Sequence, residues 1–597
     1  MSVTTHTNAK QLMAEIYGYF RQKAEAIDTS SGYPYVFFIS YGTASQRAQV
    51  WQTTDPDFST AWKRCQNFLT HLYKKNQTLP QFIKIDLAYQ FEQTTLAMLE
   101  QMIQKQAHNN HFRRGVAFDS RFELAFLEQE LYGNAIIKSE KISQPGYFDQ
   151  ANLNSYIKKK YKHQPTLILN DIKHQSVILF DTFGLLIQNN TIIELHSTGM
   201  QNGIRKIKDS DFKDHIGDLI KANAEFLYQQ IQANGKFIYG YFPTYNKILK
   251  SYNTVRHCTS LYALIESLEV HAQPDYLPKI RLAIEYALQH LYAEVHPQQT
   301  TLGYSTLGYM LDGAADAQEI KLGANAAAIL MITKYYQLTH DAQYLPYAEK
   351  IAQGILSMVS EHGETTHVLH YPSLQLKEKF RIVYYDGEAA FALLRLYQIN
   401  QSSEHLATVE HMFEQFIAKD YWKYHDHWLS YCTNELSMIK PDPRYIEFGL
   451  NNYLKNLKFI KNRQTAYATF LEMLMAAHKM VRRLQDSPHK DAQHRALLQQ
   501  AQLPELEDTI TRRAHYQRIG FFYPEMAMYF GSPQTILNAF FVRHDRFRTR
   551  IDDSEHNLSG YIAYYLHFQQ PVSAALNASD GTSHCANSLT ECTMASG

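Results

Sequence analysis

The chain has 597 residues, in which 58 Lys and Arg balance 58 Asp and Glu. Because the net charge is zero, nothing in the composition favours nucleic acid or an anionic membrane as a partner, and a neutral or small ligand is the simpler expectation. Tyrosine is frequent, with 42 residues against 4 Trp. Such amphipathic rings are typical of clefts for sugars and also of the edges of large cores.

The five cysteines show no CxxC spacing, which favours a reducing compartment and argues against a disulfide framework. The N-terminus has no basic segment followed by an apolar run, and no stretch approaches the roughly 20 apolar residues of a membrane span. We therefore expect a soluble cytoplasmic protein. Neither a GxGxxG turn nor a GxxxxGK(S/T) loop occurs, and we expect no cofactor.

Up to about residue 215 the sequence mixes helical and strand periodicities. Helices are predicted over residues 58–74 and 90–106, and strands over 33–40, 82–87, 166–169, 176–188 and 191–195. Asn189 and Asn190 predict a hairpin turn between the last two strands. Segment 113–135 ends in a helix whose acidic residues we interpret as a solvated face rather than a site. The prediction for residues 1–215 is an α+β domain.

After residue 215 the strand signal disappears and helical segments follow one another. Residues 263–291, 331–359 and 393–417 share one plan, and 434–460 follow it more loosely: a helix, a polar loop, an aromatic residue or His, and a second amphipathic helix. Each such hairpin buries its apolar face only against its neighbours. About twelve helices make six hairpins, the number in a closed α/α barrel, and their uneven spacing argues against an open solenoid. We predict an (α/α)6 toroid over 216–570 and a disordered tail over 571–597.

Polar residues are grouped at the start of each predicted inner helix. If the inner helices all run in one direction, these starts share one rim and the groups converge there. The groups are residues 252–257, 321–325, 384–388, 425–428, 462–465 and 550–556. Asp386, Asp426 and Asp553 could simply be N-caps or first-turn acids, and Gly323 and Gly387 could serve only tight packing. Capping does not require the Arg, Tyr and His beside them, so we predict a binding site at the rim.

The residue types at the rim suit proton transfer on a polyhydroxylated substrate. As catalytic groups we predict the carboxylates and histidines that can act as general acids or bases: Glu388, His257, Asp426, His427, Asp552 and His556. As substrate-binding groups we predict arginines that could clamp an anion, aromatic rings that could stack, and two amides: Tyr252, Asn253, Arg256, Asn325, Tyr384, Tyr385, Trp428 and Arg550. A glycosidase needs two carboxyl groups at a defined separation, whereas an epimerase needs two opposed acid/base groups. The excess of His and Tyr favours an epimerase.

Metal binding is an alternative interpretation of the same helix starts. Asp552 and His556 are four residues apart and would face one way on a helix, and His425 and His427 flank Asp426. Neither spacing is a zinc signature, and 28 His in the chain make accidental pairs common. We therefore predict no metal.

The segments YNTVRHCTSLYAL (252–264), YYDGEAAFALLRLY (384–397) and DHWLSYCTNEL (426–436) resemble the six-hairpin toroids of carbohydrate-active enzymes, and among these the D-glucuronyl C5-epimerase and N-acylglucosamine 2-epimerase types. The resemblance covers roughly residues 236–566 and implies a funnel at the rim as the site and a sugar or uronate as the ligand. Lanthionine-cyclase-like proteins share the toroid, but Cys258 and Cys432 lack the further ligand that their zinc site requires.

The sequence therefore predicts a carbohydrate-active enzyme of epimerase or hydrolase type that acts on a sugar or uronate unit, for example in envelope or exopolysaccharide metabolism. Two alternatives stay open. One is a non-catalytic helical-repeat protein that binds a peptide or a protein partner. The other is a tailoring enzyme whose peptide or amino-acid substrate would place its carboxylate on Arg256 and Arg550. The N-terminal domain could bind a partner or a second substrate, or cap the rim.

Overall fold

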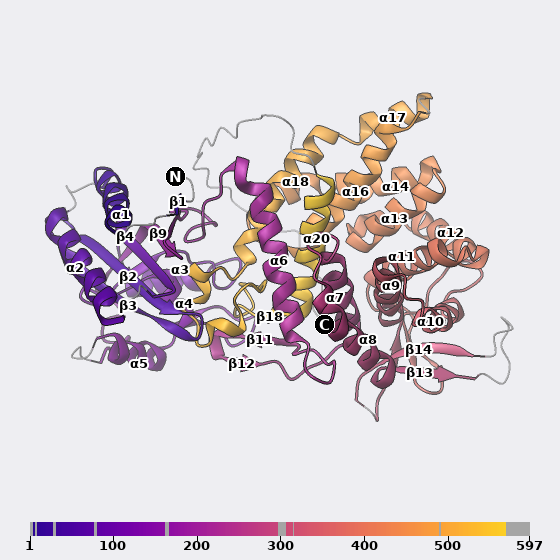
Figure 1. Cartoon of the computed structure of the whole chain (residues 1–597), viewed down its shortest axis with the longest axis horizontal. Coiled ribbons are helices and arrows are strands. Elements are labelled where there is room, and N and C mark those ends of the chain that lie inside the picture. Colours follow the sequence, from indigo (N-terminus) through magenta and orange to yellow (C-terminus); the bar gives the residue numbers. More distant parts are fainter. Residues whose placement is uncertain are drawn as a thin grey trace.

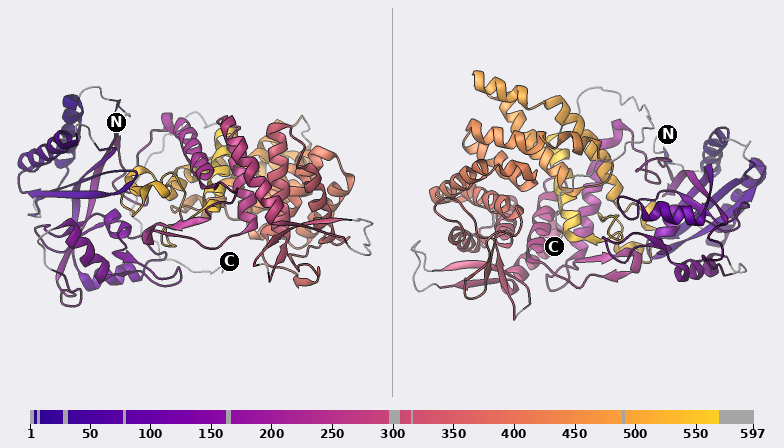
Figure 2. Two further views of the ribbon diagram at one scale, coloured as in Figure 1. Left: turned by 60° about the horizontal axis from the view of Figure 1, so that its bottom comes forward. Right: turned by 180° about the vertical axis from the view of Figure 1, so that it is seen from behind.

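The computed structural model of the protein describes residues 4–5, 9–27, 32–76, 80–161, 166–296, 306–314, 316–488 and 491–568. A sheet-rich part lies at one end of the longest axis and a ring of helices at the other (Figure 1, Figure 2). No helix in these ranges is long and apolar enough to cross a membrane. The predicted tail, residues 571–597, lies outside the described residues.

The N-terminal part is built on an antiparallel sheet. Its strands follow the order β1 (Thr4–Thr5), β10 (Thr191–Glu194), β9 (Ser176–Gln188), β4 (Phe82–Thr95), β2 (Tyr35–Thr43) and β3 (Gln46–Asp55), with β5 (Gly115–Ala117) and β6 (Ala125–Phe126) beside β9. Phe37 and Ile39 of β2 belong to the buried cluster under α1 (Ala9–Ala24) and α2 (Phe58–Asn76), which cover one face. The predicted hairpin is confirmed, because Asn189 and Asn190, with φ of 51° and 61°, join β9 to β10.

The opposite face of the sheet packs on a segment from the far end of the chain. Met528 and Tyr529, which follow α19 (Pro524–Ala527), belong to one buried cluster with side chains of β2. The Ala48 amide donates to the Met528 carbonyl at 2.7 Å, and the Tyr529 hydroxyl donates to Ser40 at 2.7 Å. A larger hydrophobic cluster extends over residues 96–568. The two parts thus share buried contacts, and the division at residue 215 stays a prediction.

Two local predictions in the N-terminal part are wrong. The segment 90–106 is helical only from α3 (Leu96–Gln104) onward, because β4 continues to Thr95, which pairs with β9 and then caps the helix by accepting from the Met98 amide at 3.3 Å. The segment 166–169 forms no strand. Instead the Asn154 side chain bonds the amide and carbonyl of Leu167, at 2.9 and 2.8 Å. A side chain therefore satisfies the backbone that a strand partner would have satisfied.

The acidic helix that we expected to face solvent is buried. It is α4 (Glu128–Gly133), and Glu128 Oε1 lies 2.9 Å from both Arg113 Nε and Arg543 Nη1. Glu130 Oε1 lies 2.7 Å from Lys160 Nζ. Carboxylates are tolerated in an interior when they are paired with cations. Glu128 therefore joins the N-terminal part to Arg543, near the end of the chain, and Glu130 joins α4 to Lys160 within the N-terminal part.

The C-terminal part forms a closed ring of paired helices. The inner helices are α7 (Thr254–Ser267), α9 (Leu322–Thr339), α11 (Tyr384–Asn400), α13 (His427–Ile439), α16 (Ala468–Asp486) and α20 (Ile551–His567). Each inner helix packs against the next, and α20 packs against α7, which closes the ring (Figure 1). The outer helices are α6 (Phe212–Gln230), α8 (Leu277–His290), α10 (Leu345–Ser357), α12 (Ser403–Ala418), α14 (Pro443–Leu454) and α18 (Leu503–Gln517). Over the described residues, the predicted barrel of six hairpins is confirmed.

Inner and outer helices differ in how much of their surface is buried. In the inner helix α9 every residue from Leu322 to Tyr335 is buried. In the outer helix α10 the buried residues form one stripe that includes Ala348, Ile351 and Ile355. A helix that is apolar all round belongs in a core, and one with an apolar stripe covers it. Two shorter helices, α15 (Leu457–Asn462) and α17 (Ala492–Gln500), are added beside α14, α16 and α18.

Short strands lie between the helices, although the sequence showed no strand signal there. One small sheet contains β11 (Gly240–Phe242), β12 (Lys247–Ile248) and β18 (Thr549–Arg550). A second contains β13 (Tyr292–Val295), β14 (Leu307–Asp312), β15 (Glu319–Lys321), β16 (Val368–His370) and β17 (Leu376–Glu378). A separate pair, β7 (Ile137–Lys138) and β8 (Tyr147–Phe148), belongs to the N-terminal part. Most are too short for an alternating pattern to be recognised. Because β15 leads directly into α9 and β18 into α20, these strands position the starts of two inner helices.

Neighbouring inner helices approach closely at two glycines. A Cβ atom at Gly387 of α11 would lie 2.8 Å from both the Leu429 amide nitrogen and Trp428 Cβ of α13. A Cβ atom at Gly323 of α9 would meet the carboxylate of Glu388 on α11. Both glycines therefore permit the packing of one inner helix against the next.

We expect Gly387→Ala to lower the free energy of unfolding by about 1–3 kcal/mol, because the added methyl group forces the backbones of α11 and α13 apart. Urea unfolding followed by circular dichroism measures this. Gly18→Ala in α1 is the matched control, since nothing lies within 4 Å of its added Cβ atom. The control should raise stability by about 0.5–1 kcal/mol through helix propensity. Equal stability changes in the two variants would contradict the packing argument.

Candidate active site

The first turns of the inner helices lie against one another at one rim of the ring. Arg256 of α7 is paired with Asp552 of α20, with 2.9 Å between Nε and Oδ2. The ring of Tyr384, the first residue of α11, lies 5.7 Å from the ring of His427, the first residue of α13. His427 in turn lies 5.0 Å from His556 of α20, centroid to centroid. The expected convergence is therefore observed for α7, α11, α13 and α20.

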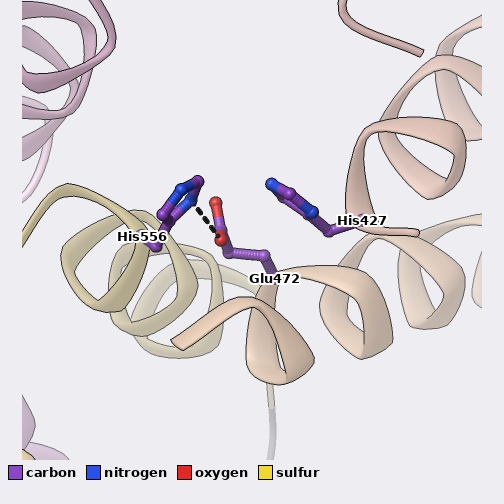
Figure 3. A group of neighbouring side chains, drawn as sticks. All are labelled: His427, Glu472 and His556. Carbon is purple, nitrogen blue, oxygen red and sulfur yellow. Dashed lines mark hydrogen bonds and ion pairs between the residues drawn. The ribbon is translucent and has the colours of Figure 1, made fainter. Parts of the chain in front are cut away.

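Two histidines and a glutamate from three inner helices meet at this rim, and we call them the central group. They are His427 of α13, Glu472 of α16 and His556 of α20, and one nitrogen or carboxylate oxygen of each lies within 4.8 Å of the others. Figure 3 shows the Glu472 side chain between the two imidazoles. His427 and Glu472 are 2% and 1% exposed, whereas the His556 side chain is 22% exposed. Of the three, His556 is the member most open to solvent.

A carboxyl group lies beside one nitrogen of each imidazole. His427 Nδ1 lies 3.1 Å from Asp426 Oδ1, and Asp426 also caps α13 by accepting from the Leu429 amide at 2.9 Å. His556 Nδ1 lies 3.0 Å from Glu472 Oε2. A carboxylate on one ring nitrogen fixes the orientation of the ring and leaves the other nitrogen for a substrate. Asp426 therefore acts both as the helix cap that the sequence allowed and as a positioning group.

Three buried carboxyl groups at the site hold their protons more strongly than usual. Burial raises the pKa of Glu388 to about 8, and the charge of Asp426 adds to the effect. Burial likewise raises the pKa of Glu472 to about 8. It also raises the pKa of Glu555, next to His556 in α20, well above the ordinary value. A carboxyl group that is protonated near neutral pH can act as a general acid.

Several buried polar atoms at the rim lack a hydrogen-bond partner among the described residues. They are Glu388 Oε2, His427 Nε2, Asp552 Oδ1 and Glu555 Oε2. Leaving such an atom unsatisfied costs about 1–3 kcal/mol, so such groups call for a partner such as water or a ligand. Hydroxyl groups both donate and accept, and a ligand rich in them matches a set of carboxyl oxygens and an imidazole nitrogen.

Aromatic rings surround the central group. The Trp428 ring is 4.9 Å from that of His427. Tyr384 contacts the same imidazole, whereas Tyr385 is turned toward His367, with 5.4 Å between ring centroids. Burial raises the pKa of both tyrosine hydroxyls, so both stay protonated near neutral pH. The predicted aromatic residues Trp428 and Tyr384 therefore line the central group, and Tyr385 lies beside it.

Several predicted site residues are not brought to the central group, among them His257, Tyr252 and Asn325. His257 is fully buried, with Nε2 2.9 Å from the Ala283 carbonyl of α8 and Nδ1 2.7 Å from the Tyr252 hydroxyl. Burial lowers its pKa to about 4, so the ring stays neutral. Asn325 accepts from the Met310 amide at 2.8 Å and so attaches α9 to β14. Each of these side chains joins structural elements to one another.

The two arginines that we expected to clamp an anion are engaged by the protein itself. Arg256 Nε and Arg550 Nη2 lie 2.9 and 3.0 Å from Asp552 Oδ2. Arg550 also pairs with Asp553 at 3.0 Å, and Asp553 caps α20 by accepting from the Arg550 amide at 2.9 Å. Asp552 therefore neutralises positive charge where α20 meets α7, and its buried Oδ1 atom has no hydrogen-bond partner among the described residues.

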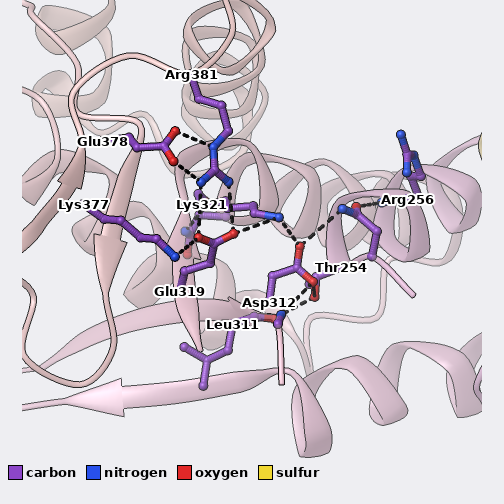
Figure 4. A network of polar contacts seen from close by, with 12 residues as sticks. Thr254, Arg256, Leu311, Asp312, Glu319, Lys321, Lys377, Glu378 and Arg381 are labelled. Carbon is purple, nitrogen blue, oxygen red and sulfur yellow. Dashed lines mark hydrogen bonds and ion pairs between the residues drawn. The ribbon is translucent and has the colours of Figure 1, made fainter. Parts of the chain in front are cut away.

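A network of charged side chains fixes the second small sheet to the rim (Figure 4). Asn253 caps α7 and donates to Asp312 Oδ2 at 3.3 Å, and Lys321 Nζ lies 2.6 Å from the same oxygen. Glu319 accepts from both Lys321 and Arg381, at 3.1 and 3.0 Å. The predicted binding residue Asn253 is thus part of a network that aligns β14 and β15 with the starts of α7 and α9.

Two buried glutamates at the site were not among the predicted catalytic residues: Glu555, which lies within the predicted group 550–556, and Glu472, which lies outside every predicted group. The predicted group at 462–465 precedes α16, whereas Glu472 lies in the second turn of that helix. It is the one acid in the buried run from Phe470 to Met475. Because burying a carboxyl group in an apolar helix is costly, a lone acid in such a run is the signal that could have identified it.

The central group could also hold a metal ion, since two imidazoles and a carboxylate are a ligand set that zinc accepts. This set differs from the pair Asp552 and His556 considered from the sequence, because Asp552 is held by two arginines. The absence of a metal therefore stays a prediction.

No protein-family model matches the chain, and no curated protein sequence is significantly similar to it. Similar solved structures include the GH76A alpha-1,6-mannanase of Salegentibacter sp. HEL1_6, at 12% identity and a TM-score of 0.39 over 58% of this chain and 98% of that one. Cellobiose 2-epimerase from Bacillus thermoamylovorans B4167 has 10% identity and a TM-score of 0.41 over 59% and 99%. A D-mannose isomerase has 12% identity and a TM-score of 0.43, over 60% of this chain and 99% of that one. These likenesses are too distant to assign a family or an activity.

We expect the protein to lose stability between about pH 5 and pH 8, because Glu388, Glu472 and Glu555 bind protons more tightly in the folded state than in the unfolded chain. Over the pH range in which such a group is protonated in the folded state and ionised in the unfolded chain, it should lower the free energy of unfolding by up to about 1.4 kcal/mol per pH unit. The Gln side chain of Glu388→Gln cannot ionise, so the free energy of unfolding of this variant should fall less as the pH rises. The difference in free energy of unfolding between the variant and the wild type should therefore favour the variant most at pH 8. Urea unfolding at several pH values measures this.

Glu361→Gln is the control for this experiment, because the Glu361 side chain is 86% exposed. It should keep the pH dependence of the wild type. If Glu388→Gln also keeps that dependence, the raised pKa of Glu388 is wrong.

Proposed function

We propose that the protein is an enzyme that epimerises or isomerises a sugar or uronate unit, with His427 and His556 as the acid/base pair. The observation that supports this is the central group, in which two imidazoles from α13 and α20 lie 5.0 Å apart beside Glu472. Each imidazole has a carboxylate at Nδ1, which leaves Nε2 of both rings for one substrate. Two oriented bases at one site match a reaction that removes a proton and returns one.

The proposed reaction begins at the carbon next to the carbonyl group of the opened sugar. One imidazole removes the proton from this carbon, and the electron pair moves to the carbonyl oxygen, which takes a proton from a neighbouring acid. Return of a proton to the same carbon from the other imidazole, with the oxygen giving its proton back to the acid, gives the epimer. Return of a proton to the former carbonyl carbon, with the hydroxyl group on the first carbon giving its proton to the ionised acid, gives the isomer. Glu388 and Glu555, both with raised pKa values, are suitable acids for the oxygen.

The sugar class is supported by the other side chains at the rim. Glu388 Oε2, Asp552 Oδ1 and Glu555 Oε2 are buried and lack partners among the described residues, and hydroxyl groups of a sugar can donate to them. Tyr384, which is half-buried beside His427, offers an apolar surface to a sugar ring. The resemblance of the helix starts to sugar epimerases agrees with this substrate class.

A glycoside hydrolase is the second candidate, and one observation favours it. Glu388 is protonated near neutral pH partly because the charge of Asp426 lies nearby, and a glycosidase needs one protonated and one ionised carboxyl group. In that case Glu388 would protonate the leaving oxygen, and Asp426 would activate water or attack the sugar. Glu388→Gln would then abolish activity, whereas the histidine variants would retain much of it.

We expect His427→Asn and His556→Asn each to lower kcat by about a hundredfold to ten-thousandfold, because each removes one of two proton-transfer groups. The assay incubates mannose, glucose, cellobiose, N-acetylglucosamine and glucuronate oligosaccharides with the protein in deuterium oxide. Proton NMR then follows both the new isomer and the loss of hydrogen from the reacting carbon. Deuterium uptake accompanies epimerisation by proton transfer, and it does not accompany glycoside hydrolysis.

The control is His362→Asn, since the His362 side chain is 78% exposed. It should turn over substrate as the wild type does, and circular dichroism should show that all three variants are folded. Full activity in both His427→Asn and His556→Asn on a substrate that the wild type converts would rule out the proposed pair.

We expect the activity to survive removal of divalent metal ions. The proposed proton transfer uses His427 and His556 alone, and Glu472 Oε2 is already bonded to His556 Nδ1 at 3.0 Å. Dialysis against a chelator, followed by metal analysis of the protein and by the same NMR assay, measures this. One equivalent of zinc that leaves together with the activity would show that the central group is a metal centre.

A further inference from the structure

A cavity of about 390 Å³ lies where the N-terminal part meets the first hairpin of the ring. It is lined by Arg47 of β3, by the end of α4, by α5 (Gln150–Lys160) and by residues 244–247, which include the start of β12. Figure 1 shows α5 and β12 along the same edge of the molecule. A volume of this size is in the range of small-molecule sites. None of the lining residues belongs to the rim described above.

The charge of the cavity wall is entirely positive. Arg47, Lys159 and Lys247 line it, and no carboxylate does. None of these three cations is within 4 Å of a carboxylate in the described part of the chain, as an ion pair would require. Glu130 accepts from the hydroxyl of the lining residue Tyr156 at 2.7 Å, but its charge is paired with Lys160. The cavity therefore offers three positive charges that the protein does not neutralise.

Arg47 is the most constrained of these cations. Its Nη1 atom donates to Asn134 Oδ1 at 2.6 Å, and its Nε atom is buried without a hydrogen-bond partner among the described residues. Burial lowers the pKa of the Arg47 guanidinium, and no carboxylate opposes that shift. A partly buried cation held by one neutral amide is unfavourable unless an anion binds to it.

We propose that this cavity binds the phosphate group of a small phosphorylated molecule. A phosphomonoester carries about two negative charges near neutral pH, which suits three cations better than the single charge of a carboxylate does. The planar guanidinium of Arg47 can bind two phosphate oxygens, and Lys159 and Lys247 act as point charges. Asn152 and Ser155 of α5 add neutral donors in the same wall.

The site lies outside the central group, so it goes beyond the proposed sugar chemistry and can be tested without turnover. Its walls come from α5 in the N-terminal part and from β12 in the C-terminal part. Because the site exists only when both parts are folded, a bound phosphate compound should raise the midpoint of thermal unfolding, by an amount that grows with the logarithm of its concentration over its Kd.

The test is isothermal titration calorimetry at low ionic strength with inorganic phosphate, with glucose 6-phosphate and with glucose. The wild type should bind both phosphate compounds and not glucose at the same site. Arg47→Gln should weaken binding of both at least about tenfold, because it removes a charge-assisted hydrogen-bond pair, and Lys159→Gln should weaken it about threefold or more. Lys158→Gln is the matched control, since it removes the same charge from the same helix at a residue that does not line the cavity.

Circular dichroism shows whether each variant is folded, and Lys159→Gln decides the question if Arg47→Gln does not fold. Failure of the wild type to bind either phosphate compound overturns the proposal. So does binding that is equally tight in Lys159→Gln and the wild type, or equally weakened in Lys158→Gln. Binding of glucose as tight as that of glucose 6-phosphate overturns the assignment of the phosphate group.

Discussion

The contact between α20 and α7 closes the ring, and the positions of the rim side chains depend on it. These helices are the last and the first inner helices along the chain, and an ion pair joins their starts, between Arg256 and Asp552 at 2.9 Å. In addition, Gly240 of β11, which precedes α7, pairs with Arg550 of β18, which leads into α20. Asp552 is 8% exposed in its side chain, so loss of Arg256 would leave a nearly buried charge with one fewer partner. Closure of the ring also brings His556 beside His427.

The rim carries groups that do not favour the folded state. Glu388, Glu472 and Glu555 are all buried, and each resists ionisation. An apolar side chain at any of these positions would avoid the cost of burying a carboxyl group. Groups that lower stability and still occupy the centre of a fold are typical of sites that bind or react. The surrounding helices supply the compensating stability, as the fully buried stretch of α9 illustrates.

The N-terminal part shares buried contacts with residues from the end of the chain. Residues after α18 return to the sheet, where Met528 and Tyr529 pack on β2, and Arg543 reaches Glu128 of α4. Glu128, an acid that the sequence pattern placed on a solvent-exposed helix face, thus forms a buried ion pair with a distant segment of the chain. The cavity beside Arg47 lies at this junction, which is where the two parts can share a ligand.

The sequence by itself determined the paired helices, the six inner-helix starts and the residue types at the rim. Periodicity reports which face of a helix is apolar. The repeated Tyr or His at the start of an outer helix, such as Tyr344, which is bonded to Glu285 of α8 at 3.2 Å, reflects contact between successive hairpins. Only the tertiary structure decided which polar residues meet. His257 and His427 both begin inner helices, yet one faces α8 and the other faces His556. The rotation of a helix about its axis and the partners of a buried charge depend on contacts distant in sequence, and a local pattern does not encode them.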